Sequence, residues 1–121
     1  MSAEADDGLA RQLRALRREY LADSAQRVDE LRGLLARLAK GERVALRELT
    51  QAFHRLAGSG GSYGFPLVST QSRDGERLAT RLAAEAGPIA DTDIASLRGC
   101  VDAIALAFAE ARSTLDKEPP D

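Results

Sequence analysis

Apolar residues recur along most of this chain at intervals of three and four, which is the spacing of an amphipathic helix. No segment shows the strict alternation of a half-buried strand. The first two helical patterns run through Leu9, Leu13, Leu16 and Tyr20, and then through Ala25, Val28, Leu31, Leu35 and Leu38. The pattern is compatible either with a break at Asp23-Ser24 or with one bent helix, so it predicts four or five helices in all.

Turn and cap residues mark the other helix ends. Gly41 ends the second pattern, Pro66 suits the first turn of a later helix, and Asp91 or Thr92 can cap the last one. A third helix is therefore expected from about residue 44 into a glycine-rich segment, a fourth from 66 to about 86, and a fifth from about 91 to 115.

Short links between such helices predict an all-α fold, an antiparallel four-helix bundle with an additional short N-terminal helix. With 121 residues and 44% hydrophobic content, the chain suffices for one domain, which we place at residues 1–117. Residues 118–121 contain Pro119-Pro120, which cannot continue a helix, and are expected to form a flexible tail. A monomer is expected because each helix shows a single apolar stripe.

Composition narrows the classes of function. Lys and Arg number 17 against 19 Asp and Glu, so a net charge of −2 gives no reason to expect nucleic acid or a membrane as partner. The chain has no apolar run of about 20 residues and begins with acidic residues, which favours a cytoplasmic protein. The single cysteine, Cys100, is expected to be a small buried residue. One histidine and one cysteine do not make a metal site, and no nucleotide-binding motif is present, so neither a cofactor nor autonomous kinase activity is expected.

The candidate chemistry lies at His54, the only histidine. Leu49, Phe53 and Leu56 form the apolar stripe of its helix, which turns His54 outward. Glycines follow at positions 58, 60, 61 and 64, and each costs up to about 1 kcal/mol inside a helix. They either end the helix or permit close approach by a neighbouring helix or a docking protein. An exposed histidine beside bare backbone predicts chemistry shared with a partner.

The segment His54-Arg55-Leu56-Ala57-Gly58-Ser59, with Gly64 ten positions after the histidine, resembles the histidine phosphotransfer (HPt) domains of two-component phosphorelays. The family pattern is a histidine, an apolar residue at two, often lysine at three, glycine at four, a small residue at five and glycine at ten. Five of these six features are present. The resemblance implies a phosphoryl carrier whose partners are response regulator receiver domains or a hybrid histidine kinase, with Mg²⁺ held by the receiver.

The resemblance also implies roles for individual residues. His54 would accept the phosphoryl group on Nε2 from a receiver phospho-aspartate and return it to another response regulator. Glu76, 22 residues later, matches the glutamate that orients the imidazole in the phosphotransfer domain of chemotaxis kinases. Gly58 and Gly64 would give the active-site loops of the receiver room, and Ser59 would either bind the phosphoryl oxygens or cap backbone. The docking surface would include Gln51, Gly61, Tyr63 and Gly64.

Two departures from the family pattern stand out. Ala57 occupies the position where many members carry lysine, and Arg55, Arg47 and Arg73 are either substitutes for that cation or solvated surface charges. Asp74-Gly75 lies where apolar residues are usual, so the fourth helix is either locally loosened or packed unusually close to its neighbour.

Two alternative functions remain open. The chain could be the phosphotransfer segment of a larger histidine kinase, phosphorylated by an ATP-binding domain, although Met1 and the Pro-Pro tail favour a stand-alone protein. It could also be a helical adaptor that binds receiver domains without being phosphorylated, but such an adaptor would not need the histidine.

Overall fold

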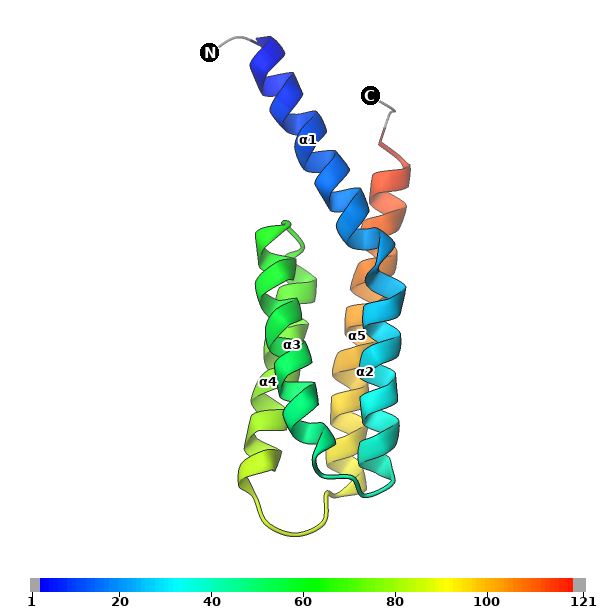
Figure 1. Ribbon diagram of the computed structural model, residues 1–121. Helices are drawn as coiled ribbons and strands as arrows, with labels where there is room; N and C mark the ends of the chain where they lie inside the picture. The colour runs from blue at the N-terminus through cyan, green and yellow to red at the C-terminus, as the bar shows by residue number, and fades with distance from the viewer. Residues whose placement is uncertain (1–2, 119–121) are drawn as a thin grey trace.

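The computed structural model describes residues 3–118, which form five α-helices and, within that range, no strand. They are α1 (Ala3–Ala22), α2 (Ser24–Ala39), α3 (Ala45–Ser62), α4 (Pro66–Ala84) and α5 (Asp91–Asp116). The helices α2 to α5 form an antiparallel bundle, while α1 leans away from one end of it (Figure 1). The all-α prediction is confirmed. The N-terminal helix is also present, but its 20 residues make it longer than α2, so the prediction that it is short was wrong.

The core is built from the apolar stripes that the spacing predicted. Phe53 of α3 and Phe108 of α5 are fully buried, and so are aliphatic side chains from all four bundle helices, among them Leu31, Leu38, Leu46, Leu49, Val68, Leu82, Leu97, Val101 and Ile104. Burial of one such side chain contributes about 1.5–3 kcal/mol. The buried face of α3 therefore fixes this helix in the bundle, and His54 lies on the face that is not buried.

Helices α3 and α4 pack close together because glycines replace side chains at their contact. A Cβ atom on Gly75 would lie 2.6 Å from Cε1 of Phe53, and one on Gly60 would lie 2.9 Å from Cγ1 of Val68. Of the alternatives for Gly75, close packing is the one found. Gly58, Gly60 and Gly61 lie inside α3, so they do not end it.

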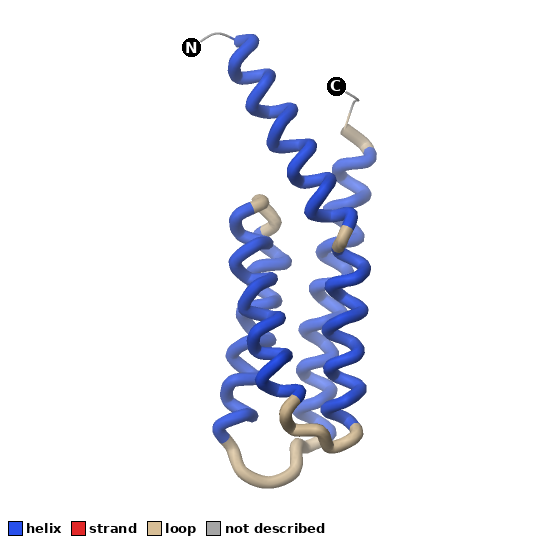
Figure 2. Tube along the Cα trace, viewed as in Figure 1, coloured by secondary structure: helices blue, strands red, loops and turns tan. Residues whose placement is uncertain are grey.

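Short turns connect the bundle helices (Figure 2). Gly41, Gly64 and Gly87 adopt the left-handed conformation, with φ of 93°, 84° and 90°, which costs glycine little. Pro66 is the first residue of α4, as expected.

Two predictions about helix ends were wrong in detail. Helix α4 ends at Ala84 instead of about 86, and no side chain caps α5, because its N-cap residue is Ala90. Asp91 instead lies in the first turn of α5, where its charge interacts favourably with the helix dipole.

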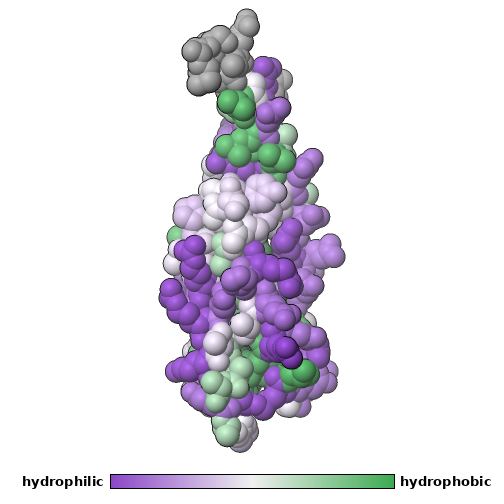
Figure 3. Space-filling model, turned by 60° about the vertical axis from the view of Figure 1, so that its left-hand side comes forward, coloured by the Kyte–Doolittle hydropathy of each residue, from purple (hydrophilic) through white to green (hydrophobic). Residues whose placement is uncertain are grey.

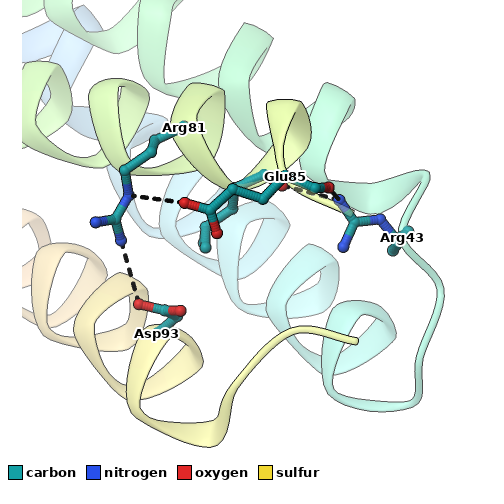
Figure 4. A network of polar contacts seen from close by, with 5 residues as sticks. Arg43, Arg81, Glu85 and Asp93 are labelled. Atoms are coloured by element: carbon teal, nitrogen blue, oxygen red, sulfur yellow. Dashed lines mark hydrogen bonds and ion pairs between the residues drawn. The ribbon is translucent and has the colours of Figure 1, made fainter. Parts of the chain in front are cut away.

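The side chain of Arg43, in the turn between α2 and α3, closes the other end of the bundle (Figure 4). Its guanidinium donates hydrogen bonds to the carbonyl oxygens of Leu82, Glu85 and Gly87, at 2.8, 2.6 and 2.6 Å. These acceptors belong to the C-terminal end of α4 and the loop after it, where carbonyls lack partners within the helix. Arg43 thus ties the end of α4 to the start of α3.

Helix α1 breaks from α2 at Asp23, and its C-terminal turn packs on the bundle through Tyr20 and Leu21. The ring of Tyr20 is buried and stacks on Tyr63 with 4.5 Å between centroids. Toward the N-terminus of α1, the side chains of Leu9, Leu13 and Leu16 are 59%, 41% and 47% exposed. Apolar surface is visible on this part of the molecule in Figure 3. A single stripe per helix was the reason to expect a monomer. That reason does not hold for α1, whose stripe is exposed, and the monomer remains a prediction.

Three further expectations concern single segments. Of the predicted tail 118–121, Glu118 is described, whereas residues 119–121 lie outside the described part. Cys100 is half-buried instead of buried, and burial together with the charge of Asp74 raises the pKa of its thiol. Within residues 3–118 we find no helix that has both the length and the apolar character to cross a membrane.

Candidate functional site

His54 lies in the middle of α3 and points out of the bundle. Its neighbour Phe53 is completely buried, while the imidazole side chain is 75% exposed. Adjacent residues of a helix are separated by about 100° around the axis, so the burial of Phe53 fixes the outward direction of His54. A nucleophile in this position is open to attack a group on another protein.

Glu76 of α4 holds the ring from one side. Its Oε1 lies 2.9 Å from Nδ1 of His54, and its side chain is 28% exposed. An ionised carboxylate can only accept a hydrogen bond, so Nδ1 must carry the proton and donate it. The other ring nitrogen, Nε2, then keeps its lone pair in the neutral imidazole. The close packing of α3 and α4 brings these two residues together across 22 positions of sequence.

A shallow hollow of about 630 Å³ lies between α3 and α4 beside the imidazole. It is lined by His54, Ala57, Gly58, Arg73, Glu76, Arg77, Thr80 and Arg81. A Cβ atom on Gly58 would meet nothing within 4 Å, so the backbone of α3 is bare on this side. The hollow is therefore open to solvent, and three arginines of α4 line it.

The sequence indicated Arg73 but not Arg77 or Arg81. Arginines four residues apart lie on one face of a helix, so their spacing was available as a signal. Their relation to His54 depends on the register of α4 against α3, which the spacing alone does not give. The structure places Arg73 in the hollow, whereas Arg47 and Arg55 of α3 do not line it.

The other predicted residues fall into two groups. Gln51, Arg55, Gly58 and Gly61 are exposed on α3, as His54 is. Ser59, Tyr63 and Gly64 instead lie at the contact with α1. The hydroxyl oxygens of Ser59 and Tyr20 are 2.7 Å apart, Tyr63 stacks on Tyr20, and Gly64 lies against the guanidinium of Arg17. Of the two alternatives for Ser59, the backbone contact is present, because its hydroxyl donates to the carbonyl oxygen of Leu56 at 3.5 Å, while a contact with phosphoryl oxygens remains a prediction.

Among residues 3–118, no group of three or more His, Cys, Asp or Glu side chains is placed to hold a metal ion.

A family model described as "Hpt domain" matches residues 15–107. The chain belongs to the Hpt domain family. The match spans the bundle from the later part of α1 to most of α5 and includes His54 and Glu76. No curated protein and no solved structure matches the chain significantly. Hpt domains are phosphoryl carriers that interact with receiver domains, so this chain has a histidine phosphotransfer role in a phosphorelay.

Proposed function

We propose that His54 accepts a phosphoryl group from the phospho-aspartate of a receiver domain and passes it to the aspartate of another response regulator. The observation that carries this proposal is the hydrogen bond between Nδ1 of the exposed His54 and Glu76. This bond occupies Nδ1 and leaves Nε2 free to act as the nucleophile.

In the transfer step, the lone pair of Nε2 forms a bond to phosphorus. The bond between phosphorus and the aspartate oxygen breaks, and its electron pair remains on the aspartate carboxylate. The ring keeps its proton at Nδ1 and so becomes positively charged. Glu76 stabilises that charge through the hydrogen bond it already accepts. Transfer to the second aspartate follows the same path in reverse.

The surroundings of His54 suit a carrier that works in the active site of its partner. Phosphoryl transfer depends mainly on positioning and charge compensation, and the receiver supplies the Mg²⁺ and the acidic pocket. The bare backbone at Gly58 permits close approach, and Gln51 and Gly61 are also exposed on α3. The protein then acts as a cytoplasmic monomer without a cofactor of its own.

The proposal is tested by incubating wild-type protein and the His54→Gln variant with a panel of phosphorylated receiver domains. The expected result is an acid-labile, alkali-stable phosphoryl group, detected by intact mass, on the wild type alone. Labelling by a kinase catalytic domain with ATP, but by no receiver, would instead establish a segment of a histidine kinase. Binding to receivers without labelling would establish an adaptor.

A further inference from the structure

Phosphorylation of His54 adds negative charge beside Glu76, and no side chain of α3 brings a positive charge into the hollow. The phosphoryl group carries nearly two negative charges, and only the imidazole ring would separate it from the carboxylate of Glu76. Ala57 faces the hollow without a charge, and Arg47 and Arg55 do not line it. The cations that line the hollow beside the imidazole all come from α4.

Helix α4 presents a row of three arginines to the hollow: Arg73, Arg77 and Arg81. Arg81 is drawn toward α5, because its Nη2 lies 3.2 Å from Oδ1 of Asp93 and its Nε lies 3.9 Å from Oε1 of Glu85. Figure 4 shows this side chain between its two carboxylates. Its charge is already compensated by those two acidic groups.

Arg77 is also paired with an acidic group. Its Nη1 lies 3.1 Å from Oδ1 of Asp74, and Asp74 acts electrostatically on Cys100 of α5. Arg73, in contrast, forms no ion pair with any residue in the range 3–118. It lies one helical turn before Glu76, on the side of the hollow where Gly58 leaves the backbone of α3 bare. No side chain at position 58 blocks its reach toward the imidazole.

We propose that Arg73 of α4 is the positioning residue that binds the phosphoryl oxygens at His54, in place of a cation at position 57 of α3. This inference rests on the proposed phosphorylation of His54. A guanidinium donates two parallel hydrogen bonds to phosphoryl oxygens and neutralises part of their charge. Arg73 thereby attracts the anionic donor and holds it near Nε2.

The test uses phosphoramidate, a small anionic phosphoryl donor, so that no cognate receiver is needed. The lone pair of Nε2 forms the new bond to phosphorus, the donor's own P–N bond breaks, and its electron pair leaves with ammonia, which takes up a proton. The rate of labelling of the full chain is followed by intact mass. We expect Arg73→Ala to lower this rate about five- to tenfold at about 0.01 M ionic strength and far less at about 1 M, where charges are screened within about 3 Å.

Matched variants separate charge from structure. Arg73→Lys should retain most of the rate, and Ala57→Lys in the Arg73→Ala background should restore it, because Ala57 lines the same hollow. Arg77→Ala should cost less than Arg73→Ala, because Asp74 already engages Arg77. Arg98→Ala, on α5 and outside the hollow, should change nothing.

Two results would overturn the assignment to Arg73: an unchanged rate in Arg73→Ala, or an equal loss at both ionic strengths with no rescue by lysine. A larger loss in Arg77→Ala would also contradict it. Failure of the proposed phosphorylation gives a different result, because wild type would then be labelled no faster than His54→Gln.

Discussion

At the scale of single residues, the site depends on one hydrogen bond between neighbouring helices. Nδ1 of His54 and Oε1 of Glu76 are 2.9 Å apart, and the imidazole is otherwise largely in solvent. Nothing else that the structure describes holds the ring. The orientation of Nε2 and the stabilisation of a charged ring therefore both depend on Glu76.

The variant Glu76→Gln separates these two contributions. The amide oxygen can still accept the hydrogen bond, but the negative charge is lost. We expect transfer from a phosphorylated receiver to slow about three- to tenfold, equivalent to about 0.7–1.4 kcal/mol of transition-state stabilisation. Single-turnover kinetics with Glu76→Gln and Glu76→Ala would measure this, and we expect the alanine variant to be slower. Wild-type rates in both variants would show that Glu76 has no part in the reaction.

A second prediction at this scale concerns Gly75. A methyl group there would overlap the ring of Phe53, which is fully buried and has no room to move. Overpacking of this kind costs about 1–3 kcal/mol, while alanine gains up to about 1 kcal/mol in helix propensity. We therefore expect Gly75→Ala to lower the free energy of unfolding by about 1 kcal/mol in urea titrations.

The matched control for Gly75 is Gly33→Ala in α2. A Cβ atom on Gly33 would meet nothing within 4 Å. Only the propensity gain applies there, so this variant should be stabilised by up to about 1 kcal/mol. If both variants were stabilised equally, the close contact between Gly75 and Phe53 would be refuted.

At the scale of the helices, the packing of α3 against α4 positions the site, and Arg43 secures the far end of that pair. We expect Arg43→Ala to lower the free energy of unfolding by about 1–2 kcal/mol, because three carbonyl oxygens lose a charged donor. Arg81→Ala, at the same end of α4, removes only exposed ion pairs and should cost less than about 1 kcal/mol. Equal losses in thermal unfolding would contradict the role given to Arg43.

The apolar spacing was sufficient to predict where the helices lie, because every bundle helix buries one stripe. It could not decide whether the glycines after His54 end α3 or allow close packing. That depends on Val68 and Ser69 of α4, which approach Gly60 only in the folded bundle. The same limit applies to Ser59, whose partner Tyr20 lies 39 positions away, and to Arg77, whose place in the hollow follows from the register of α4.

At the scale of the whole molecule, the C-terminal part of α1 packs on the bundle, while its N-terminal part leans away. Arg17 donates a hydrogen bond from Nε to the carbonyl oxygen of Tyr63 at 3.0 Å, and Tyr20 is buried among aromatic rings. The apolar residues of α1 have the same spacing as those of the bundle helices, although most of α1 is exposed. Burial requires a surface to pack against, and the spacing does not reveal whether such a surface exists.

Removal of residues 1–12 should therefore leave the bundle intact. The one large apolar side chain lost from the described residues is Leu9, which is 59% exposed, so we expect the free energy of unfolding to change by less than about 1 kcal/mol. Tyr20→Ala should cost about 3 kcal/mol or more, because it empties a buried aromatic site. A large loss of stability in the truncated protein would show that the start of α1 packs on the bundle in solution.

The central claim is that His54 carries the phosphoryl group on Nε2 while Nδ1 keeps its proton for Glu76. NMR of the phosphorylated, ¹⁵N-labelled protein tests it most directly, because coupling to phosphorus identifies the modified ring nitrogen. We predict that phosphorus is bonded to Nε2 of His54 and that the proton remains on Nδ1. Phosphorus on Nδ1, or on a residue other than His54, would contradict the site described above.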